Sequence, residues 1–420
     1  MLPKLFLFLK AISVIFSLTY WRIKLRIQAS IHQWTYRAVA DPKNVVVIGG
    51  SFAGFFLAKQ LAQSLPTGYK AIVIEKHSHY HFTWNFPRIS VISGHTQNAF
   101  IPYPTQPSLA PVGAYSFRQG EVVEIEPNQV TLADGSSIPF EYLAITTGSQ
   151  ARYPAELDAN DKPGCMKFFE ARQVRIKSAE SIVIVGGGAA GVELAGDIKS
   201  KYLQKSVTLV HSRKQLLNNF DSGLHDVAKK ALEEMDVDLC LGERVIAGLD
   251  SEDATEVVLQ SGKRLECDAL FQCTGQKPCS DLTRQAFPSS VAPNGYIRVE
   301  PTFQVKGAPR NIFACGDVVD LPGPKLGRAA AMQGMFVAEN IVRSIKGQTL
   351  RAYTPGIMDN SIELTLGLGK NVMYLNDGST GMGFSKKVTD LDMHAAQNWK
   401  MLDMKPFNDL SDVQDKVTAA

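Results

Sequence analysis

The chain has 420 residues, of which 45% are hydrophobic and 20% charged, as in an ordinary globular protein of two or three domains. Its formal net charge is only +3. Residues 1–40 hold six basic and no acidic side chains, so the remaining 38 basic and 41 acidic residues leave a body of −3. Such a body gives no electrostatic case for nucleic-acid binding. The six cysteines form neither C-x-x-C nor zinc-ligand spacing, so we predict no metal site.

Residues 1–42 form an apolar, basic leader. Its segment LFLFLKAISVIFSLTYW is shorter than the roughly 20 apolar residues that span a bilayer, and Lys10 lies near its centre. A helical wheel puts five polar residues on one stripe, which favours an amphipathic helix in a membrane interface. These residues are Lys10, Ser13, Ser17, Lys24 and Gln28. A mitochondrial presequence is the second interpretation, and no clean cleavage site supports a secretory signal.

The first nucleotide-binding pattern is NVVVIGGSFAGFFLAKQL at 44–61, an apolar strand followed by a glycine turn and a helix. The key places of G-x-G-x-x-G hold Gly49, Ser51 and Gly54, so the middle glycine is missing. The next strand, KAIVIE, ends on Glu75, whose carboxylate can accept hydrogen bonds from an adenosine ribose. Because serine is small and the helix N-terminus still presents its amides to a phosphate, we interpret Ser51 as a tolerated variant.

Two stretches separate this pattern from the next. Residues 76–116 are rich in His, Pro and aromatic residues, and they predict a long loop with short helices. Residues 117–148 alternate and are broken by EPNQ and ADGSS, which predicts a small β-meander.

The second nucleotide-binding pattern is SIVIVGGGAAGVELAGDI, in which Gly186, Gly188 and Gly191 complete the fingerprint. The strand that follows ends on His211, where an acid would select NADH, and Arg213 comes two residues later. Loss of the acid removes repulsion of a 2′-phosphate, so NADPH is favoured over NADH. The other interpretation is that Arg213 simply lies in solvent and contacts no cofactor.

The rest of the chain is mixed. Residues after 295 predict short strands, the segment NIFACGDVVD, and a helix ending near residue 345. Residues 356–420 predict a small domain with strands at 362–368 and 371–375.

Together these patterns are similar to those of a known family. The chain resembles the apoptosis-inducing-factor-like, ferroptosis-suppressor type of NAD(P)H:quinone reductase, a flavoprotein with two dinucleotide-binding domains. The resemblance covers about residues 43–410, and Ser51 departs from the glycine more usual there. It rests on the segments RQGEVVEIE, YLAITTGS, VGGGAAGVELAGDIKSKY, VTLVHS, LFQCTGQKP, NIFACGDVVD and AYTPG.

The resemblance implies an α/β fold with two Rossmann-like domains, for FAD and NAD(P)H, plus a small α+β C-terminal domain. We predict a discontinuous FAD-binding domain at 43–175 and 295–355, a NAD(P)H-binding domain at 176–294, and a C-terminal domain at 356–420.

The resemblance also assigns roles to single residues. Glu193 in GVE would face the nicotinamide, and the turn Cys273–Thr274–Gly275 would close that site. The implied FAD contacts are Gly49, Gly50, Ser51, Phe52, Ala53, Gly54, Glu75, Arg88, Val122, Thr147, Gly148, Gly316 and Asp317.

In such enzymes the flavin carries the reaction, so the protein needs little acid–base machinery. Related disulfide reductases keep a cysteine pair beside the flavin. The first helix and the second domain of this chain have none, so we expect a diffusible acceptor. The segment KLGRAAAMQGMFVAENIV resembles a helix of type II NADH dehydrogenases, which implies that Gln333 approaches a quinone pocket. The other interpretation is that Gln333 is an ordinary residue on the polar face of a helix.

We therefore predict a FAD-dependent oxidoreductase that passes electrons from NAD(P)H to a quinone or another small lipophilic acceptor at a membrane. We expect the catalytic body in the cytosol, with mitochondrial targeting as the second interpretation; a homodimer is left open. The alternatives are a tailoring oxidoreductase of one lipophilic metabolite and, from another class, a redox-gated interaction protein.

Overall fold

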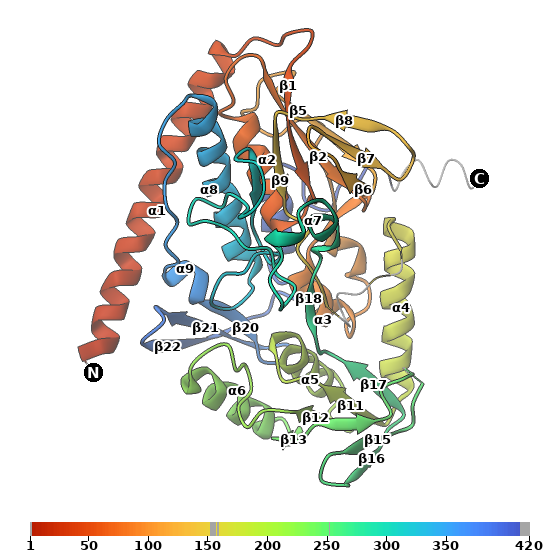
Figure 1. Ribbon diagram of the computed structural model, residues 1–420. Helices are drawn as coiled ribbons and strands as arrows, with labels where there is room; N and C mark the ends of the chain where they lie inside the picture. Colours follow the sequence, from red (N-terminus) through yellow and green to blue (C-terminus); the bar gives the residue numbers. More distant parts are fainter. Residues whose placement is uncertain (1, 152–156, 158, 252, 412–420) are drawn as a thin grey trace.

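The computed structural model describes residues 2–151, 157, 159–251 and 253–411, so parts of the predicted leader, FAD-binding and C-terminal segments lie outside it. Two regions are each built on a parallel sheet, and a small antiparallel sheet lies beside them (Figure 1). Helix α1 runs along the outside of the molecule. The arrangement confirms the predicted α/β fold class, while the exact domain boundaries stay predictions.

The first region holds a five-stranded sheet in the order β19–β9–β1–β2–β5, with every pair parallel. Strand β1 is a run of β-branched residues whose last four are buried, as in a parallel sheet covered on both faces. Helices α2 and α8 pack against each other beside this sheet. The elements are β1 (Lys43–Ile48), α2 (Phe52–Ala62), β2 (Tyr69–Glu75), β5 (Tyr115–Gln119), β9 (Tyr142–Ile145), β19 (Ile312–Ala314) and α8 (Gly327–Ile345).

The predicted meander is only partly right. Its two ends, β5 and β9, pair in parallel with β2 and β1 and so join the main sheet. Only its middle forms an antiparallel sheet, of β6 (Val122–Ile125), β7 (Gln129–Leu132) and β8 (Ser137–Pro139). The 76–116 stretch has the expected short helices and also a small antiparallel strand pair. Its elements are β3 (His79–His81), η1 (Thr83–Asn85), α3 (Phe86–Ile89), η2 (Thr96–Ala99) and β4 (Phe100–Pro102).

The second region holds a four-stranded parallel sheet in the order β13–β12–β11–β17 and an antiparallel sheet of β14, β15 and β16. A two-stranded antiparallel ribbon, β10 with β18, connects it to the first region. Its elements are α4 (Lys162–Ser178), β11 (Ser181–Val185), α5 (Ala189–Lys201), β12 (Ser206–His211), α6 (Ser222–Glu234), β13 (Asp238–Leu241), β14 (Val245–Ala247), β15 (Glu256–Leu259), β16 (Arg264–Glu266) and β17 (Ala269–Gln272). The ribbon and the segment after it contain β10 (Ser149–Ala151), β18 (Gln276–Pro278), α7 (Asp281–Ala286) and η3 (Pro288–Ser290).

The C-terminal elements form a three-stranded antiparallel sheet with short helices. The strand predicted at 362–368 ends at Thr365, because Gly367 has a φ of +80° and turns the chain. A third strand, absent from the prediction, has the sequence GMGFSKK, whose glycines and lysines give little strand signal. The elements are α9 (Ile357–Asn360), β20 (Ile362–Thr365), β21 (Lys370–Asn376), β22 (Gly381–Lys387) and α10 (Ala395–Met401).

Helix α1 (Leu2–Thr35) is continuous and docks on the body by one face. Polar contacts fix it along its length. Lys10 Nζ donates to Asp377 at 2.9 Å, Trp21 Nε1 to Glu339 at 3.0 Å, and the ring of His32 meets the Leu65 carbonyl at 2.6 Å. The docked face is buried or half-buried and recurs every three or four residues, at Leu7, Ala11, Val14, Leu18, Trp21, Leu25, Ala29 and His32.

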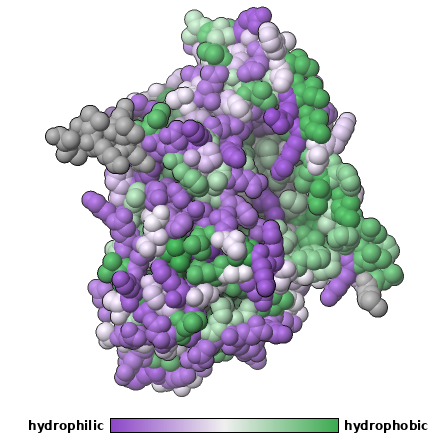
Figure 2. All heavy atoms as spheres, turned by 180° about the vertical axis from the view of Figure 1, so that it is seen from behind, coloured by the Kyte–Doolittle hydropathy of each residue, from purple (hydrophilic) through white to green (hydrophobic). Residues whose placement is uncertain are grey.

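The opposite face of α1 is apolar and exposed. Phe16, Tyr20 and Trp34 are 72%, 72% and 81% exposed. From behind, hydrophobic surface forms a band along the edge of the molecule, where α1 lies (Figure 2). By length and composition α1 could also cross a membrane, but a signal sequence passes the same test. The predicted polar stripe is exposed between these two apolar faces. The outer face contains Leu2, Phe6, Leu9, Phe16, Tyr20, Ile23, Ile27, Ile31 and Trp34.

Candidate active site

A cavity of about 1390 Å³, here called the cofactor cavity, is lined by both glycine turns. It brings together most of the residues predicted for the site, although they come from segments up to 268 positions apart, Gly49 to Asp317. The predicted residues that line it are Gly49, Ser51, Phe52, Ala53, Glu75, Val122, Thr147, Gly148, Gly186, Gly188, Glu193, His211, Gly275, Gly316 and Asp317. Their individual contacts with cofactors stay predictions.

At the first turn, two positions require glycine and the middle one does not. Gly49 has a φ of +96°, and a Cβ on Gly54 would lie 1.8 Å from the Gly49 carbonyl oxygen. Ser51 has φ −80° and ψ −154°, an extended conformation open to any residue. Its side chain makes no capping hydrogen bond to α2, which leaves the hydroxyl available to a phosphate. This geometry agrees with the interpretation of Ser51 as a tolerated variant.

Glu75 is held in place by the first turn. Its Oε2 accepts from the Gly50 N–H at 2.6 Å, and its Oε1 accepts from the backbone N–H of His77 at 3.0 Å. Burial by itself would raise the pKa of Glu75, but the hydrogen bonds from His77 and Gly50 outweigh it and lower the pKa to about 2. The carboxylate is therefore ionised at neutral pH and can accept from ribose hydroxyls. Gly50 does not line the cofactor cavity, but its N–H holds the Glu75 carboxylate in place.

The second turn repeats this geometry with a different partner. A Cβ on Gly191 would lie 1.9 Å from the Gly186 carbonyl oxygen, whereas one on Gly188 would meet nothing within 4 Å. His211 Nδ1 accepts from the Gly187 N–H at 3.1 Å, which requires a ring unprotonated at that nitrogen. Burial also lowers the pKa of His211, so the ring is neutral at physiological pH.

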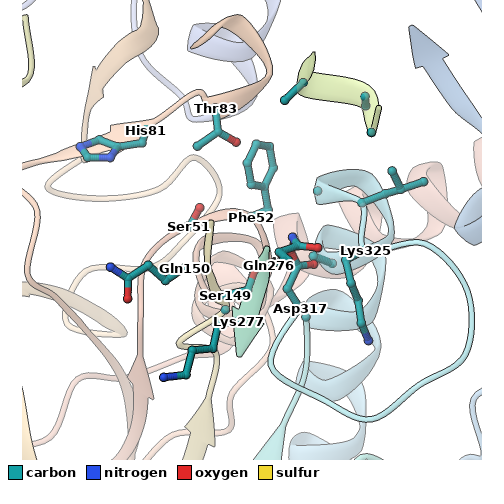
Figure 3. Close-up of a pocket in the computed structure, with 18 of the residues that line it drawn as sticks. Ser51, Phe52, His81, Thr83, Ser149, Gln150, Gln276, Lys277, Asp317 and Lys325 are labelled. Carbon is teal, nitrogen blue, oxygen red and sulfur yellow. Dashed lines mark hydrogen bonds between the residues drawn. The ribbon is translucent and has the colours of Figure 1, made fainter. Parts of the chain in front are cut away.

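Asp317 lies where the two regions meet. Its Oδ2 accepts from Gln276 Nε2 at 3.0 Å and from Ser149 Oγ at 3.3 Å, both on the β10–β18 ribbon (Figure 3). Burial raises the pKa of Asp317, while nearby Lys325 opposes the shift. A carboxylate with these partners can exchange them for the hydroxyls of a ribityl chain.

Glu193 lies on α5 and lines the second half of the cavity. Its Oε1 accepts from the Thr365 N–H at 3.0 Å. Burial raises the pKa of Glu193 to about 8, the Thr365 bond opposes the shift, and the charge of Asp197 adds to it. The raised pKa favours the protonated form of Glu193, in which the carboxyl group can donate a hydrogen bond.

Arg88, expected to contact FAD, lies outside the cofactor cavity. It is 1% exposed, and its Nε donates to Asp197 on α5 at 2.7 Å. A second bond reaches the Gly367 carbonyl at 3.3 Å. A buried guanidinium needs a counter-charge, and Asp197 supplies it. Arg88 therefore joins α3 to α5 and the turn after β20, and its contact with FAD stays a prediction.

The arginine that lines the second half of the cofactor cavity is not the one predicted from the sequence. Arg213 is exposed and does not line the cavity, whereas Arg244 and Ser212 do. Glu243 also lines this end, and its N–H donates to the His211 carbonyl at 3.1 Å. Sequence reasoning missed Glu243 and Arg244 because they follow β13, a strand without a motif of its own.

Gln333 also lies outside the cofactor cavity. It lines a small adjoining cavity, here called the side cavity, and its Oε1 accepts from the Gly316 N–H at 2.9 Å. A backbone N–H can only donate, so the amide orientation is fixed by chemistry and the NH₂ group is left as a donor.

The cysteines are not arranged for disulfide chemistry. All six are free, and the two that line the cofactor cavity are Cys273 and Cys279. Burial raises the pKa of the Cys273 thiol to about 12 and also raises that of Cys279. Thiolates are the nucleophiles of disulfide exchange, so neither residue is activated for it.

Comparisons with known proteins agree with this geometry. Residues 43–334 match the family model described as pyridine nucleotide-disulphide oxidoreductase. The chain belongs to this family. It is 34% identical to Fe-regulated protein 8 of Mycosarcoma maydis, over 79% of the chain and 88% of that protein. It is 31% identical to ferroptosis suppressor protein 1 of Homo sapiens, over 86% and 96%.

A solved structure shows the same fold at low identity. The sulfide:quinone oxidoreductase of Aquifex aeolicus aligns with a TM-score of 0.70 and 19% identity, over 86% of this chain and 90% of that one. The resemblance to the ferroptosis-suppressor type is confirmed, and so are the enzyme class and its cofactors: the chain is an FAD-dependent NAD(P)H oxidoreductase. The first turn with Glu75 and Asp317 fits FAD, and the open approach at Gly188 fits a nicotinamide dinucleotide.

Proposed function

We propose that this enzyme reduces a quinone at a membrane surface, with α1 lying in the plane of the membrane. The observation that carries the proposal is the exposed apolar face of α1, opposite the face docked on a two-cofactor body. If this docked helix crossed a bilayer instead, it would lose its contacts with the body, such as the ion pair of Lys10 with Asp377. The flanking basic residues are suited to anionic headgroups, and Tyr20 and Trp34 to the interface.

Bound FAD would supply the redox chemistry, taking a hydride from NAD(P)H and giving electrons to the acceptor. The side chains have simpler tasks. Ser51 and the N-terminus of α2 are proposed to bind the pyrophosphate, Glu75 the adenosine ribose, and Asp317 the ribityl chain. Protonated Glu193 would orient the nicotinamide by donating to its carboxamide.

Gln333 is proposed to hydrogen-bond to the electron acceptor. A quinone carbonyl accepts hydrogen bonds, and the Gln333 NH₂ can donate because its Oε1 is already taken by Gly316. Gln333→Glu would keep an acceptor for Gly316 but lose the donor, whereas Gln333→Leu would lose both. Losing one positioned hydrogen bond is worth roughly 0.5–1.5 kcal/mol, so oxidation by quinone should slow by about three- to tenfold in both variants. If quinone oxidised Gln333→Leu slowly but Gln333→Glu at the normal rate, Gln333 would serve only to hold the Gly316 N–H.

The membrane part is tested by charge placement on α1. The triple variant Phe16→Glu, Ile23→Glu and Ile27→Glu puts three carboxylates on the outer face. The control, Ser13→Glu, Ser17→Glu and Gln28→Glu, adds the same charge to the polar stripe. In flotation with vesicles of neutral and anionic lipid, the first should lose binding and the control should keep most of it. Equal retention by both would place the membrane contact elsewhere.

The acceptor class is tested by rapid mixing. Purified protein is first reduced with NADPH. The reduced protein is then mixed with each of a panel of quinones, and the return of the absorbance of its oxidised flavin is followed. Fast return with quinones and slow return with oxygen alone support the proposal. No return with any quinone would favour a single lipophilic metabolite or a redox-gated interaction. A homodimer stays a prediction.

A further inference from the structure

We propose that strand β22 is a second membrane contact, in which Phe384 lies among lipid headgroups and Lys386 binds anionic ones. The inference rests on the proposed function and adds to it the class of lipid and the part of the body that meets it. It comes from the way in which the C-terminal sheet lies beside the N-terminal half of α1 (Figure 1).

Alternate residues of β22 face α1. Met382 packs beside Leu7, on the docked face of the helix. The next residue of that row, Phe384, meets Phe8 with ring centroids 6.4 Å apart. Successive side chains of a strand alternate between its two faces, so Lys386 continues the row that begins with Met382.

The other row of β22 turns toward the body. A Cβ on Gly383 would lie 3.3 Å from the ring of Tyr374, whose hydroxyl donates to Asp221 at the start of α6. By the same alternation Lys387 belongs to this row. The strand therefore carries one lysine on each face, and Lys386 is the one on the side of α1.

The row that faces α1 is exposed and ends in a positive charge. Phe8 and Phe384 are 44% and 42% exposed, and Lys386 is exposed too. On α1, Lys4 and Arg22 share the flank of Phe8, at spacings of four and fourteen residues. Within the part of the chain that the structure describes, neither Lys4 nor Lys386 forms an ion pair. Exposed aromatic rings between such cations suit the headgroup region of an anionic bilayer.

The positions of the two elements fit one bilayer surface. A helix is about 10 Å across, and an interfacial helix inserts about 5–10 Å into the boundary between headgroups and acyl chains. Headgroups would therefore surround the sides of α1 and approach the sheet on which it docks. Phe384 reaches the flank of α1 through Phe8, so its ring lies at this level. A second contact beside the helix would fix the roll of the body about α1, which one helix by itself leaves free.

The test reverses one charge at a time on the two faces of β22. Lys386→Glu changes the row that faces α1, Lys386→Gln removes its charge, and Lys387→Glu is the control on the opposite row. Lys387 lies opposite Lys370, so the control replaces a like-charge pair with an opposite one and should fold normally. Full-length, FAD-loaded enzyme is titrated with neutral vesicles and with vesicles that contain an anionic phospholipid. Flavin absorbance and Tm verify that each variant is folded.

On anionic vesicles we expect Lys386→Glu to bind about tenfold more weakly, equivalent to roughly 1.4 kcal/mol, and Lys386→Gln about threefold more weakly. Neutral vesicles should bind both variants like the unchanged protein, because the apolar face of α1 supplies that affinity. Lys387→Glu should change binding by less than about twofold, since its charge is on the far face and is screened. Equal losses in the two glutamate variants, or no loss in Lys386→Glu, would overturn the proposal.

Hydrogen exchange gives a readout of position. The amides of Gly381–Lys387 should exchange more slowly on anionic vesicles than in solution, because β22 is an edge strand whose outer side is unpaired in its sheet. The edge strand β16 of the second region serves as the reference and should not change. Unchanged exchange in β22 on vesicles that do bind the protein would overturn the second contact. An enzyme that binds neither kind of vesicle refutes instead the membrane part of the proposed function.

Discussion

The two glycine turns have the same backbone and different partners. In each, the N–H of the second residue donates to the side chain at the end of the next strand, Gly50 to Glu75 and Gly187 to His211. The first partner is an ionised carboxylate and the second a neutral imidazole. One local framework thus presents an acceptor for ribose in one site and a group without negative charge in the other. We expect this shared framework to bind a dinucleotide in each site, and the residue at the strand end to influence which dinucleotide binds.

The largest effect should come from the third glycine of each turn. Gly54→Ala would place a Cβ 1.8 Å from the Gly49 carbonyl, so the backbone must shift at a cost on the order of 3 kcal/mol. We expect purified Gly54→Ala to contain little FAD. Gly191→Ala, with the same clash in the second turn, should keep FAD and lose NAD(P)H binding. Flavin absorbance per chain and NADPH titration measure both, and a fully yellow Gly54→Ala protein would contradict the comparison.

The middle position should separate folding from binding. Gly188→Val leaves the fold intact, because its Cβ meets nothing within 4 Å and its φ is −79°. The side chain would occupy the approach of the pyrophosphate, so we expect at least about tenfold weaker NAD(P)H binding, roughly 1.4 kcal/mol, with FAD retained. The matched variant Ser51→Val should do the reverse. Loss of both cofactors in either variant would show that the two sites are not independent.

The choice between NADPH and NADH should depend on Arg244 more than on Arg213, because only Arg244 lines the cavity. A charged hydrogen bond to a 2′-phosphate contributes about 1.5–3 kcal/mol, so Arg244→Ala should raise the KM for NADPH relative to NADH by at least about tenfold. Arg213→Ala serves as the comparison, because Arg213 is the arginine that follows His211 in the sequence pattern. Steady-state kinetics with both nucleotides decide, and equal changes for the two would remove the preference for NADPH.

Glu193 should give a smaller, pH-dependent effect. Its pKa rises from 4.5 to about 8 on folding, so the folded protein keeps a proton that the unfolded chain has lost. Stability should therefore decline as pH rises from 4.5 through 8, and Glu193→Gln should lack this part of the decline. The difference in Tm between the two proteins, followed from pH 5 to 9, should change by about 2–4 °C. A difference that does not vary with pH would mean that Glu193 is ionised in the folded protein.

The smallest effect should come from Ser51→Gly. Ser51 already has the conformation that Gly188 has in the second turn, so the exchange should change flavin occupancy and stability by less than about 0.5 kcal/mol. Occupancy after purification and Tm are the measurements. An empty site in Ser51→Gly would mean that the serine hydroxyl is needed for FAD.

Local patterns predicted much of this protein and failed where the partner was distant. The turns at Gly49 and Gly186 follow from short segments, because a strand, a glycine turn and a helix are local. The ion pair of Arg88 was not predicted because its counter-charge, Asp197, is 109 positions away. Arg244 was missed because nothing beside it marks a site. Strand β22 was missed because its pairing with β21, not its composition, makes it a strand.

The sequence by itself determined the two dinucleotide folds, the absence of a cysteine pair beside the first turn, and the apolar character of the leader. These depend on periodicity and spacing within about 20 residues, which local backbone preferences express directly. Only the tertiary structure decided that α1 docks by one apolar face and exposes the other, and that Gln333 offers its NH₂ rather than its oxygen. Both facts depend on which groups become neighbours when the chain folds. Burial and hydrogen-bond direction are properties of such neighbours, so no spacing along the chain can specify them.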